Sequence, residues 1–460
     1  MAGLFDAISM AKQSLMAQQW AIATTGHNIA NVNTPGYTRQ RAELVPAELP
    51  MEVTCGFIGM GVDVAEIARL RNRYLDRQVL YEEQNLGFLD FQNTALSQVE
   101  IILGETSGNG LSGVLNDFWA SWSDLANDPE NSAVRIALQQ KGAELSQNLN
   151  NLYTDLTSQQ QALDTQLTGL VNQINQKTSQ IASLNKTISS LVLQGQNPND
   201  LMDQRDLLIE GLASLVNIEM QDESDGTISI WLGGQILVNN DSAQSLNLQV
   251  YSSSTGQLHS VVWNTNGKEA DFLSGQVASL LLVRDEVIPE LLSGLDEFAV
   301  GLVESVNAIH QTGYSLDGST GLDFFNPATT GAANIALSQE ISLDADKIAA
   351  SADGSAGNGE IALAIFNLQN QMVIGNDLST LNEYYAALVA DVGALAQTAQ
   401  NELAQSETAL QQLQNWQMSA EGVSLDEEMA NLVRYQQAYT ALSKFLATAD
   451  TMLEQLLAVV

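Results

Sequence analysis

Residues 149–194 read LNNLYTDLTSQQQALDTQLTGLVNQINQKTSQIASLNKTISSLVLQ, and this stretch decides the fold class. Leucine and isoleucine recur three and four residues apart, from Leu149 through Leu163 and Ile174 to Leu191. Such spacing places one apolar stripe along a helix whose other faces are polar. It predicts a helix over about residues 130–194, and at ~1.5 Å per residue this helix would be roughly 100 Å long. Helices of that length are typical of rods and fibres.

The segments on both sides of this helix are also helical by pattern. Asp128-Pro129-Glu130 predicts the helix start, with Asp128 as N-cap, and Gly195 predicts its end. Pro289 is expected to kink or interrupt one of the further helices. The apolar seams at 149–191 and 388–413 are expected to pack together. The further helices are predicted over residues 72–103, 201–216, 274–310, 359–372 and 383–418.

Between residues 218 and 263 the apolar period changes from helical to two, which indicates strands. Asp225-Gly226 and Thr255-Gly256 supply hairpin turns, so a small antiparallel sheet is predicted. Residues 314–358 are rich in Gly, Ala, Ser and Asp and are expected to form a loop with one hairpin. The predicted fold is therefore mainly α, an elongated rod of long helices with a small antiparallel β region and coiled-coil terminal helices.

The two ends of the chain each carry an apolar stripe with a seven-residue period. This period keeps a stripe facing a partner helix in a supercoil. The ends are expected to pair with each other or with neighbouring subunits. The stripe residues predicted to form the terminal interface are Ile8, Leu15, Ile22, Leu425, Leu432, Tyr435, Tyr439, Leu446 and Leu453.

The first helix is expected to end near Asn31, before a tight turn at 32–37. Pro35 presets φ for the first central position of a type II turn, and Gly36 tolerates the positive φ of the second. The chain then turns towards an extended ribbon up to residue 64. Ser424 with Glu427 forms a capping-box pattern that starts the last helix.

Two lone terminal helices come out near break-even in free energy. Burying a Leu or Ile contributes ~1.5–3 kcal/mol, whereas ordering each residue costs ~1–2 kcal/mol of backbone entropy. Only about one residue in three or four belongs to the stripe. We therefore expect the termini to be largely disordered in the monomer and to be ordered by neighbours.

The composition is strongly acidic, with 54 Asp and Glu against 17 Lys and Arg and a net charge of −37. This balance argues against a general binder of nucleic acid or anionic membranes. One cysteine, Cys55, permits no intrachain disulfide, and no signal peptide or membrane span is expected. Arginines cluster early in the chain, where they are expected either to pair with carboxylates of the same or a neighbouring subunit or to form a solvated face. The cluster is Arg39, Arg41, Arg69, Arg71, Arg73 and Arg77.

The sequence offers no catalytic, cofactor-binding or metal-binding residues. Its three histidines lie in different segments without metal-ligand spacing, and zincin, nucleophile-elbow and P-loop motifs are missing. An SxxK match at 183–186 lies in the heptad rod without its companion motifs, and residues 221–232 resemble a calcium loop only in part. Cys55 has no evident base nearby. The prediction is a protein that is not an enzyme and that carries no cofactor.

Four stretches resemble one family of flagellar proteins. GHNIANVNTPGY (26–37) resembles the N-terminal signature of bacterial flagellar rod, hook and hook-associated proteins. GVDV (61–64) with RYLDRQ (73–78), LMDQRDLL (201–208) and GVSLDEEMANLVRYQQAY (422–439) narrow the resemblance to the flagellar hook-associated protein 1 family. The residues of the first stretch taken as an assembly motif are Asn28, Ile29, Asn31, Thr34, Pro35, Gly36 and Tyr37.

The resemblance implies a structural subunit that forms the junction ring between hook and filament after type III export. It implies contacts with further copies of itself, the hook protein, the second hook–filament junction protein and a cytoplasmic export chaperone at the C-terminal helix. It places the chain in the extracellular flagellum, at the hook–filament junction, and in the cytoplasm before export. Family members often carry an outer β domain after a DFF-like stretch. Here Asp323-Phe324-Phe325 lies in a low-complexity stretch of only 45 residues, 314–358, so that domain should be small or absent.

Four regions are expected from these patterns. Residues 1–70 with 420–460 form a terminal coiled-coil and β-ribbon assembly region, and 71–216 with 270–313 and 359–419 form a helical rod. Residues 217–269 form the small antiparallel β region, and 314–358 form a short loop-rich insert. Two alternatives remain at this point: another flagellar axial protein, such as a hook or distal rod subunit, or an exported coiled-coil adhesin or effector.

Overall fold

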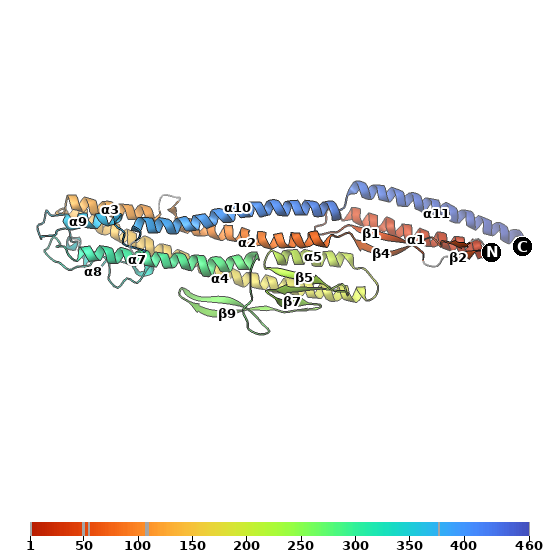
Figure 1. Cartoon of the computed structure of the whole chain (residues 1–460), viewed down its shortest axis with the longest axis horizontal. Coiled ribbons are helices and arrows are strands. Elements are labelled where there is room, and N and C mark those ends of the chain that lie inside the picture. Colours follow the sequence, from red (N-terminus) through yellow and green to blue (C-terminus); the bar gives the residue numbers. More distant parts are fainter. Residues whose placement is uncertain (1, 48–50, 54–55, 106–109, 376–377, 460) are drawn as a thin grey trace.

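The computed structural model describes residues 2–47, 51–53, 56–105, 110–375 and 378–459. Long helices run side by side in an elongated molecule, and both chain termini lie at the same end (Figure 1). The strands form small antiparallel sheets and ribbons beside these helices. The predicted fold class, a mainly α rod with a small antiparallel β region, is confirmed.

The rod is built on α4, a helix of 61 residues whose buried face carries the predicted leucine and isoleucine stripe. One boundary prediction was wrong: Asn131, not Asp128, is the N-cap, and its side chain accepts from the backbone N–H of Ala133. Pro129 lies in the turn before the helix, where its carbonyl accepts a hydrogen bond from buried Arg135 (2.8 Å). The helices of the rod are α2 (Arg73–Leu103), α3 (Leu111–Asn127), α4 (Ser132–Val192), α5 (Asn199–Ala213), α6 (Gly275–Leu282), α7 (Ile288–His310), α9 (Glu360–Phe366) and α10 (Leu381–Glu421).

The two long seams do not pack on each other as expected. Helix α10 lies along α2, whereas α4 lies along α3 and α5. The stripe of α4 is covered by these neighbours and by the small sheets, so it has no free face for α10. Pro289 interrupts its helix as predicted: a π-helical turn at Val283–Val287 separates α6 from α7.

The β region contains two sheets rather than the single sheet predicted. Strands β5 (Ile218–Asp222), β6 (Ile228–Leu232), β7 (Gln235–Asn239) and β8 (Ser242–Ala243) form one in sequential order, and β9 (Leu246–Ser253) pairs with β10 (Gly256–Trp263) in the other. Helix α4 holds the two sheets at separate positions along its length. Asn185 of α4 donates to the carbonyl of Ile228, and Asn175 exchanges two hydrogen bonds with the backbone of Leu246.

Residues 314–358 form a packed cap on the end of the rod far from the termini. Single bridges and short helical turns, among them α8 (Gln339–Leu343), replace the predicted loop with one hairpin. Phe324 and Phe325 are fully buried against Phe118 and Trp122 of α3. This aromatic core explains why so Gly- and Ser-rich a segment is ordered.

At the opposite end, α1 (Ala2–Ala30) packs along α11 (Leu425–Val459), so the ends pair with each other. We call this pair, with its strands, the terminal hairpin. The strands are β1 (Gln40–Pro46), β2 (Met51–Val53), β3 (Gly56–Ile58) and β4 (Val62–Arg69), and β1 pairs with β4 as the expected extended ribbon. Cys55 lies outside the described residues.

Candidate assembly site

The face between α1 and α11 is built mainly from small and polar side chains of α1. Ala11, Ala17 and Ala21 are buried on α1, which packs against α11, β1 and β4, and Gln19 donates to the hydroxyl of Tyr439 across the helix pair (3.2 Å). Alanine allows the helices to approach closely but buries little apolar area. The hairpin is therefore held by a weaker apolar interface than the rod.

The predicted terminal interface residues are less buried than these alanines. Leu425 is exposed, and the others are half-buried: Ile8, Leu15, Ile22, Leu432, Tyr435, Tyr439, Leu446 and Leu453. Other large apolar side chains of the hairpin face solvent. They are Phe5, Met16 and Trp20 on α1, and Leu425, Met429, Val433, Phe445 and Met452 on α11.

Asn28 is the centre of the predicted assembly motif. Its side chain is 1% exposed and exchanges two hydrogen bonds with the backbone of Gln40, at 2.8 and 3.0 Å. Its Nδ2 also donates to Glu428 of α11 (3.0 Å), and its Oδ1 accepts from the hydroxyl of Tyr37 (2.7 Å). One buried amide thus joins the end of α1, the start of β1 and the start of α11.

The rest of the motif shapes the turn that follows. Thr34 donates to Asn31, and Gly36 has the predicted positive φ of 73°. A Cβ at Gly36 would lie 3.5 Å from Leu207, so the turn leans on α5. Ile29 is half-buried and Pro35 is exposed.

The arginine cluster predicted from the sequence joins the hairpin to the rod. Arg39 pairs with Glu427 (2.8 Å) and Glu428 (2.6 Å) at the start of α11. Arg69 pairs with Asp203 (2.8 Å) and Asp206 (2.7 Å) of α5. We call these arginines and their carboxylate partners, together with Arg71 and its partners described next, the joint.

Arg71 adds the helices of the rod to the same network. It pairs with Asp76 of α2 (3.0 Å), with Asp206 of α5 and, at 3.9 Å, with Glu421 at the end of α10. Arg73 pairs with Asp222, and Arg41 pairs with Glu43 (3.3 Å). Of the two readings of the cluster, pairing with carboxylates of the same chain is the one observed for these five arginines; Arg77 is exposed.

The electrostatics of the joint follow from its burial. Burial raises the pKa of Glu421 from 4.5 to about 7, helped by the nearby carboxylate of Asp76 and opposed by Arg71 and by the backbone N–H of Asn72. Burial, with Asp200, Asp203 and Glu428 close by, also raises the pKa of the Tyr37 hydroxyl, which therefore stays a hydrogen-bond donor. Arg39, Arg69 and Arg71 lie among enough carboxylates for their charges to be compensated.

The sequence did not identify the carboxylates that complete the joint. Asp203 and Asp206 lie three residues apart on α5, a spacing that places both on one helix face and could have suggested a shared arginine partner. Glu427, expected to close a capping box, instead directs its carboxylate to Arg39. Each of the four sequence stretches that carry the family resemblance contributes side chains to the hairpin, to the joint, or to both.

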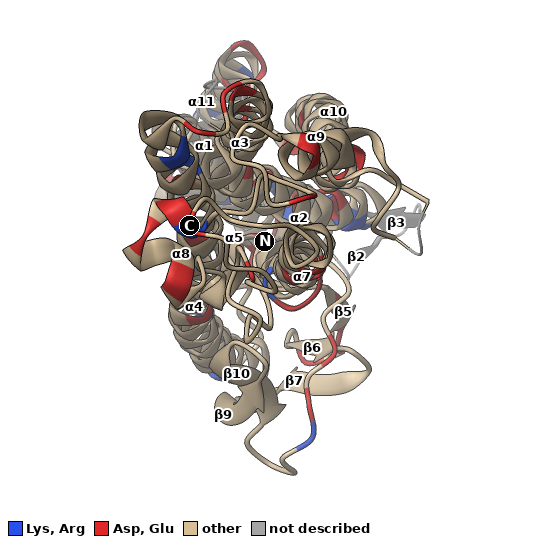
Figure 2. Ribbon diagram, turned by 90° about the vertical axis from the view of Figure 1, so that its left-hand side faces the viewer, with Lys and Arg blue, Asp and Glu red and all other residues tan. Residues whose placement is uncertain are grey.

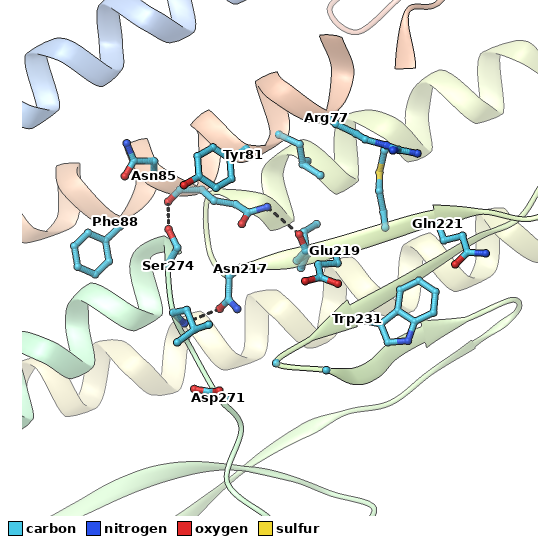
Figure 3. A pocket seen from close by; sticks show the side chains of 17 residues that line it. Arg77, Tyr81, Asn85, Phe88, Asn217, Glu219, Gln221, Trp231, Asp271 and Ser274 are labelled. Carbon is cyan, nitrogen blue, oxygen red and sulfur yellow. Dashed lines mark hydrogen bonds between the residues drawn. The ribbon is translucent and has the colours of Figure 1, made fainter. Parts of the chain in front are cut away.

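A groove of about 1010 Å³ lies between α2 and the β5–β6 hairpin. Figure 3 shows Tyr81 and Phe88 on its α2 side and Trp231 on its sheet side. Its internal hydrogen bonds tie elements together: Gln84 donates to the carbonyl of Ile218 and accepts at its own carbonyl from Ser274. Within the described residues no cluster of three or more His, Cys, Asp or Glu side chains is arranged to hold a metal ion. No helix in the described part of the chain is both long and apolar enough to cross a membrane.

Three family models match this chain. Residues 96–325 match the flagellar hook-associated protein FlgK helical domain. Residues 10–38 match the flagella basal body rod protein family, and residues 417–459 match the flagellar basal body rod FlgEFG protein C-terminal region. The two outer matches fall on the terminal hairpin, and the central match falls on the rod.

Relatives match over nearly the whole chain. Flagellar hook-associated protein 1 of Bacillus subtilis is 32% identical, with 99% of this chain and 98% of that protein covered. The protein of the same name in Salmonella typhimurium is 27% identical, with 98% and 99% covered. Both alignments, over 502 and 555 positions, are longer than the 460 residues of this chain, so both relatives carry segments that are missing here.

A solved structure shares the fold. The flagellar hook junction protein FlgK from Burkholderia pseudomallei superposes with a TM-score of 0.62 at 17% identity, and the match covers 75% of this chain and all of that one. The fold, the three family models and the near full-length relatives agree with one another. This chain belongs to the flagellar hook-associated protein 1 family.

Proposed function

We propose that this chain is a structural subunit of the bacterial flagellum that forms the junction between hook and filament. The observation that carries the proposal is the joint, because it fastens a terminal hairpin with exposed apolar side chains to a well-packed rod. Such an element buries its remaining apolar surface only against neighbours. Near full-length similarity to proteins named flagellar hook-associated protein 1 supports the site of action.

The parts of the molecule have different roles in this function. The terminal hairpin, residues 1–70 with 420–460, docks to other copies and to the hook. The rod, 71–216 with 270–313 and 359–419, sets the spacing between neighbours, and the small β region at 217–269 and the cap at 314–358 lie on its outer parts. The predicted stripe and the motif around Asn28 are the docking elements in this scheme.

The same function requires export of the chain from the cytoplasm. It leaves the cytoplasm by type III export, with a chaperone on the C-terminal helix until then, and it acts outside the cell. At the hook tip it contacts its own copies, the hook protein and the second hook–filament junction protein. It carries no cofactor and performs no catalysis.

Localisation tests the proposal. Labelled full-length protein, produced in cells that lack their own copy, is expected as a band between hook and filament, and filaments should form. A chain lacking residues 424–460 should leave α4 and the sheets folded but should be missing from the hook tip, because the deletion removes α11 and the partners of Arg39. Wild-type protein elsewhere on the cell, or a truncated chain that assembles normally, would contradict the proposal.

A further inference from the structure

A small polar cavity of about 230 Å³ lies between α1, β1 and α11. Buried Thr24 and Thr25 of α1 line one side of it, and Asn431 of α11 lines another. Three arginines surround it, Arg39 directly before β1, Arg41 on β1 and Arg434 on α11, together with the carboxylate of Glu428 that Arg39 holds. In a chain with 54 acidic and 17 basic residues, three guanidinium groups around one cavity are a concentration of positive charge.

Only one of these three charges is fully compensated within the chain. Arg39 holds both Glu427 and Glu428, and its side chain is 18% exposed. Arg41 is 58% exposed and reaches Glu43 on its own strand at 3.3 Å, a solvent-screened pair of small energy. Arg434 is exposed, and among the described residues no carboxylate lies within ion-pair distance of it. Arg434 donates instead to the hydroxyl of Tyr435 (3.3 Å), with its guanidinium 5.1 Å from the ring centre.

We propose that Arg41 and Arg434 receive a carboxylate from a second copy of this chain when terminal hairpins pack side by side. The inference rests on the proposed function, since it names the partner of the hairpin surface. A guanidinium fork matches a carboxylate in two parallel hydrogen bonds. Contact with the Tyr435 ring restricts the Arg434 side chain before binding and so lowers the entropy lost on docking.

Charge complementarity selects a second copy as the partner. Each chain carries a net charge of −37, and acidic residues are seen on several elements, among them α8 and α9 (Figure 2). Copies with such a charge repel one another unless their contact places cations opposite carboxylates. Arg41 and Arg434 are exposed cations on the element that docks, and a neighbouring copy presents carboxylates in excess.

The terminal hairpin also exposes apolar side chains on α11. Leu425, Met429 and Val433 recur every four residues on α11 and are about half exposed (47, 52 and 49%). That spacing forms one stripe on the helix surface, directly before Arg434 in sequence. The stripe lies on a face of α11 other than that of Arg434, so its burial would stabilise contacts of the hairpin beside the one that the arginines make.

Zero-length crosslinking tests the proposal. A carbodiimide couples lysine amines, but not arginine, to carboxylates in direct contact. Flagella from cells that produce the R434K variant should therefore yield a crosslinked dimer of this chain that wild-type flagella lack, with the peptide containing residue 434 joined to an Asp or Glu peptide. A new crosslink only within one chain, a crosslink to a different flagellar protein, or no new crosslink would overturn the proposal.

Charge reversal supplies a second readout. The R434E variant should occupy hook tips about tenfold less often than wild type, because it sets like charges against each other, with the same circular dichroism spectrum. Lys444, an exposed cation of the same helix, is the matched control, and K444E should assemble as wild type does. If R434E assembles normally while wild type forms the band between hook and filament, this inference fails and the proposed function stands. If wild type is not at the junction, the proposed function itself fails.

Discussion

At the residue scale, Glu421 shows how a buried carboxylate is accommodated at the joint. It lies at the end of α10 and accepts a hydrogen bond from the backbone N–H of Asn72 (2.7 Å), the N-cap residue of α2. Its backbone carbonyl accepts from the N–H of Arg39. One residue therefore links the ends of two rod helices with the first strand of the hairpin. Its burial raises its pKa to about 7, so the carboxyl group loses its proton within the neutral range.

This pKa predicts a pH dependence of stability. The folded chain binds a proton at Glu421 more tightly than the unfolded chain, so this group favours folding below pH ~4.5, and the advantage is lost as pH rises to about 7. A full shift of that size corresponds to ~3 kcal/mol. Since screening by solvent reduces such electrostatic effects, we expect a difference of about 2 kcal/mol.

Urea unfolding of wild type and E421Q across pH 4.5–8 measures this difference. The glutamine keeps an acceptor for Asn72, so the variant should lose less stability with rising pH than wild type. Exposed Glu407 on the same helix gives the matched control E407Q, whose curve should run parallel to that of wild type. Parallel curves for E421Q as well would show that the carboxyl group ionises without cost in the folded chain.

Single residues of the joint were only partly predictable from the sequence. The positive φ of Gly36 followed from the Pro-Gly pair because turn geometry is local. Asn28 was identified by resemblance. Its four hydrogen bonds could not be predicted, because they need α11, which is distant in sequence, and β1, whose position is set by the turn. The partners of the arginines were equally hidden, because a carboxylate 134 residues away leaves no local pattern.

At the scale of elements, α2 and the end of α5 approach so closely that α2 requires a glycine at the point of contact. A Cβ at Gly87 would lie 2.1 Å from the backbone carbonyl oxygen of Ser214, which already accepts from the N–H of Gln276. The contact cannot be relieved by moving a flexible side chain. The close approach brings α5, with Asp203 and Asp206, to the side of α2 where Arg69 and Arg71 lie.

Two glycine-to-alanine variants test this packing against helix propensity. G87A should lower the free energy of unfolding by about 2 kcal/mol or more, because backbone must move to admit the methyl group. G169A is the matched control: Gly169 lies on the exposed face of α4 with nothing within 4 Å of its Cβ position. It should stabilise the chain by up to ~1 kcal/mol through helix propensity alone. Chemical unfolding measures both, and equal stability of the two variants would refute the close contact.

Elements were predictable where their signal is periodic, and less so where it depends on partners. The apolar stripe predicted almost the full length of α4, because one apolar face of this helix is buried from end to end. The start of α10 was placed two residues late, although Thr380 and Glu383 form a capping box that the sequence displays. The pairing of α10 with α2 could not be predicted from the apolar stripe of either helix. Several helices carry such a stripe, and the pattern alone does not say which two pack together.

At the scale of the whole molecule, packing quality changes along the rod. The end near the cap is an aromatic core, with Phe118, Trp122 and Phe324 fully buried. The terminal hairpin, at the other end, has alanines at its centre and keeps Trp20 56% exposed. The joint separates these two regimes. A monomer built this way should hold a firm rod and carry hairpin ends that become fully ordered only against neighbours.

Hydrogen exchange on the purified monomer tests this account most directly. We predict strong protection of α2 and α4, intermediate protection of residues 27–40 around Asn28, and weak protection of residues 5–25 and 436–455. N28A should remove the protection of residues 27–40 and leave α4 unchanged, because the hydrogen bonds of that amide hold the turn, the start of β1 and the start of α11 and do not reach the rod. Protection of residues 5–25 and 436–455 equal to that of α4 would contradict the account, since it would mean that the hairpin is as stable alone as the rod.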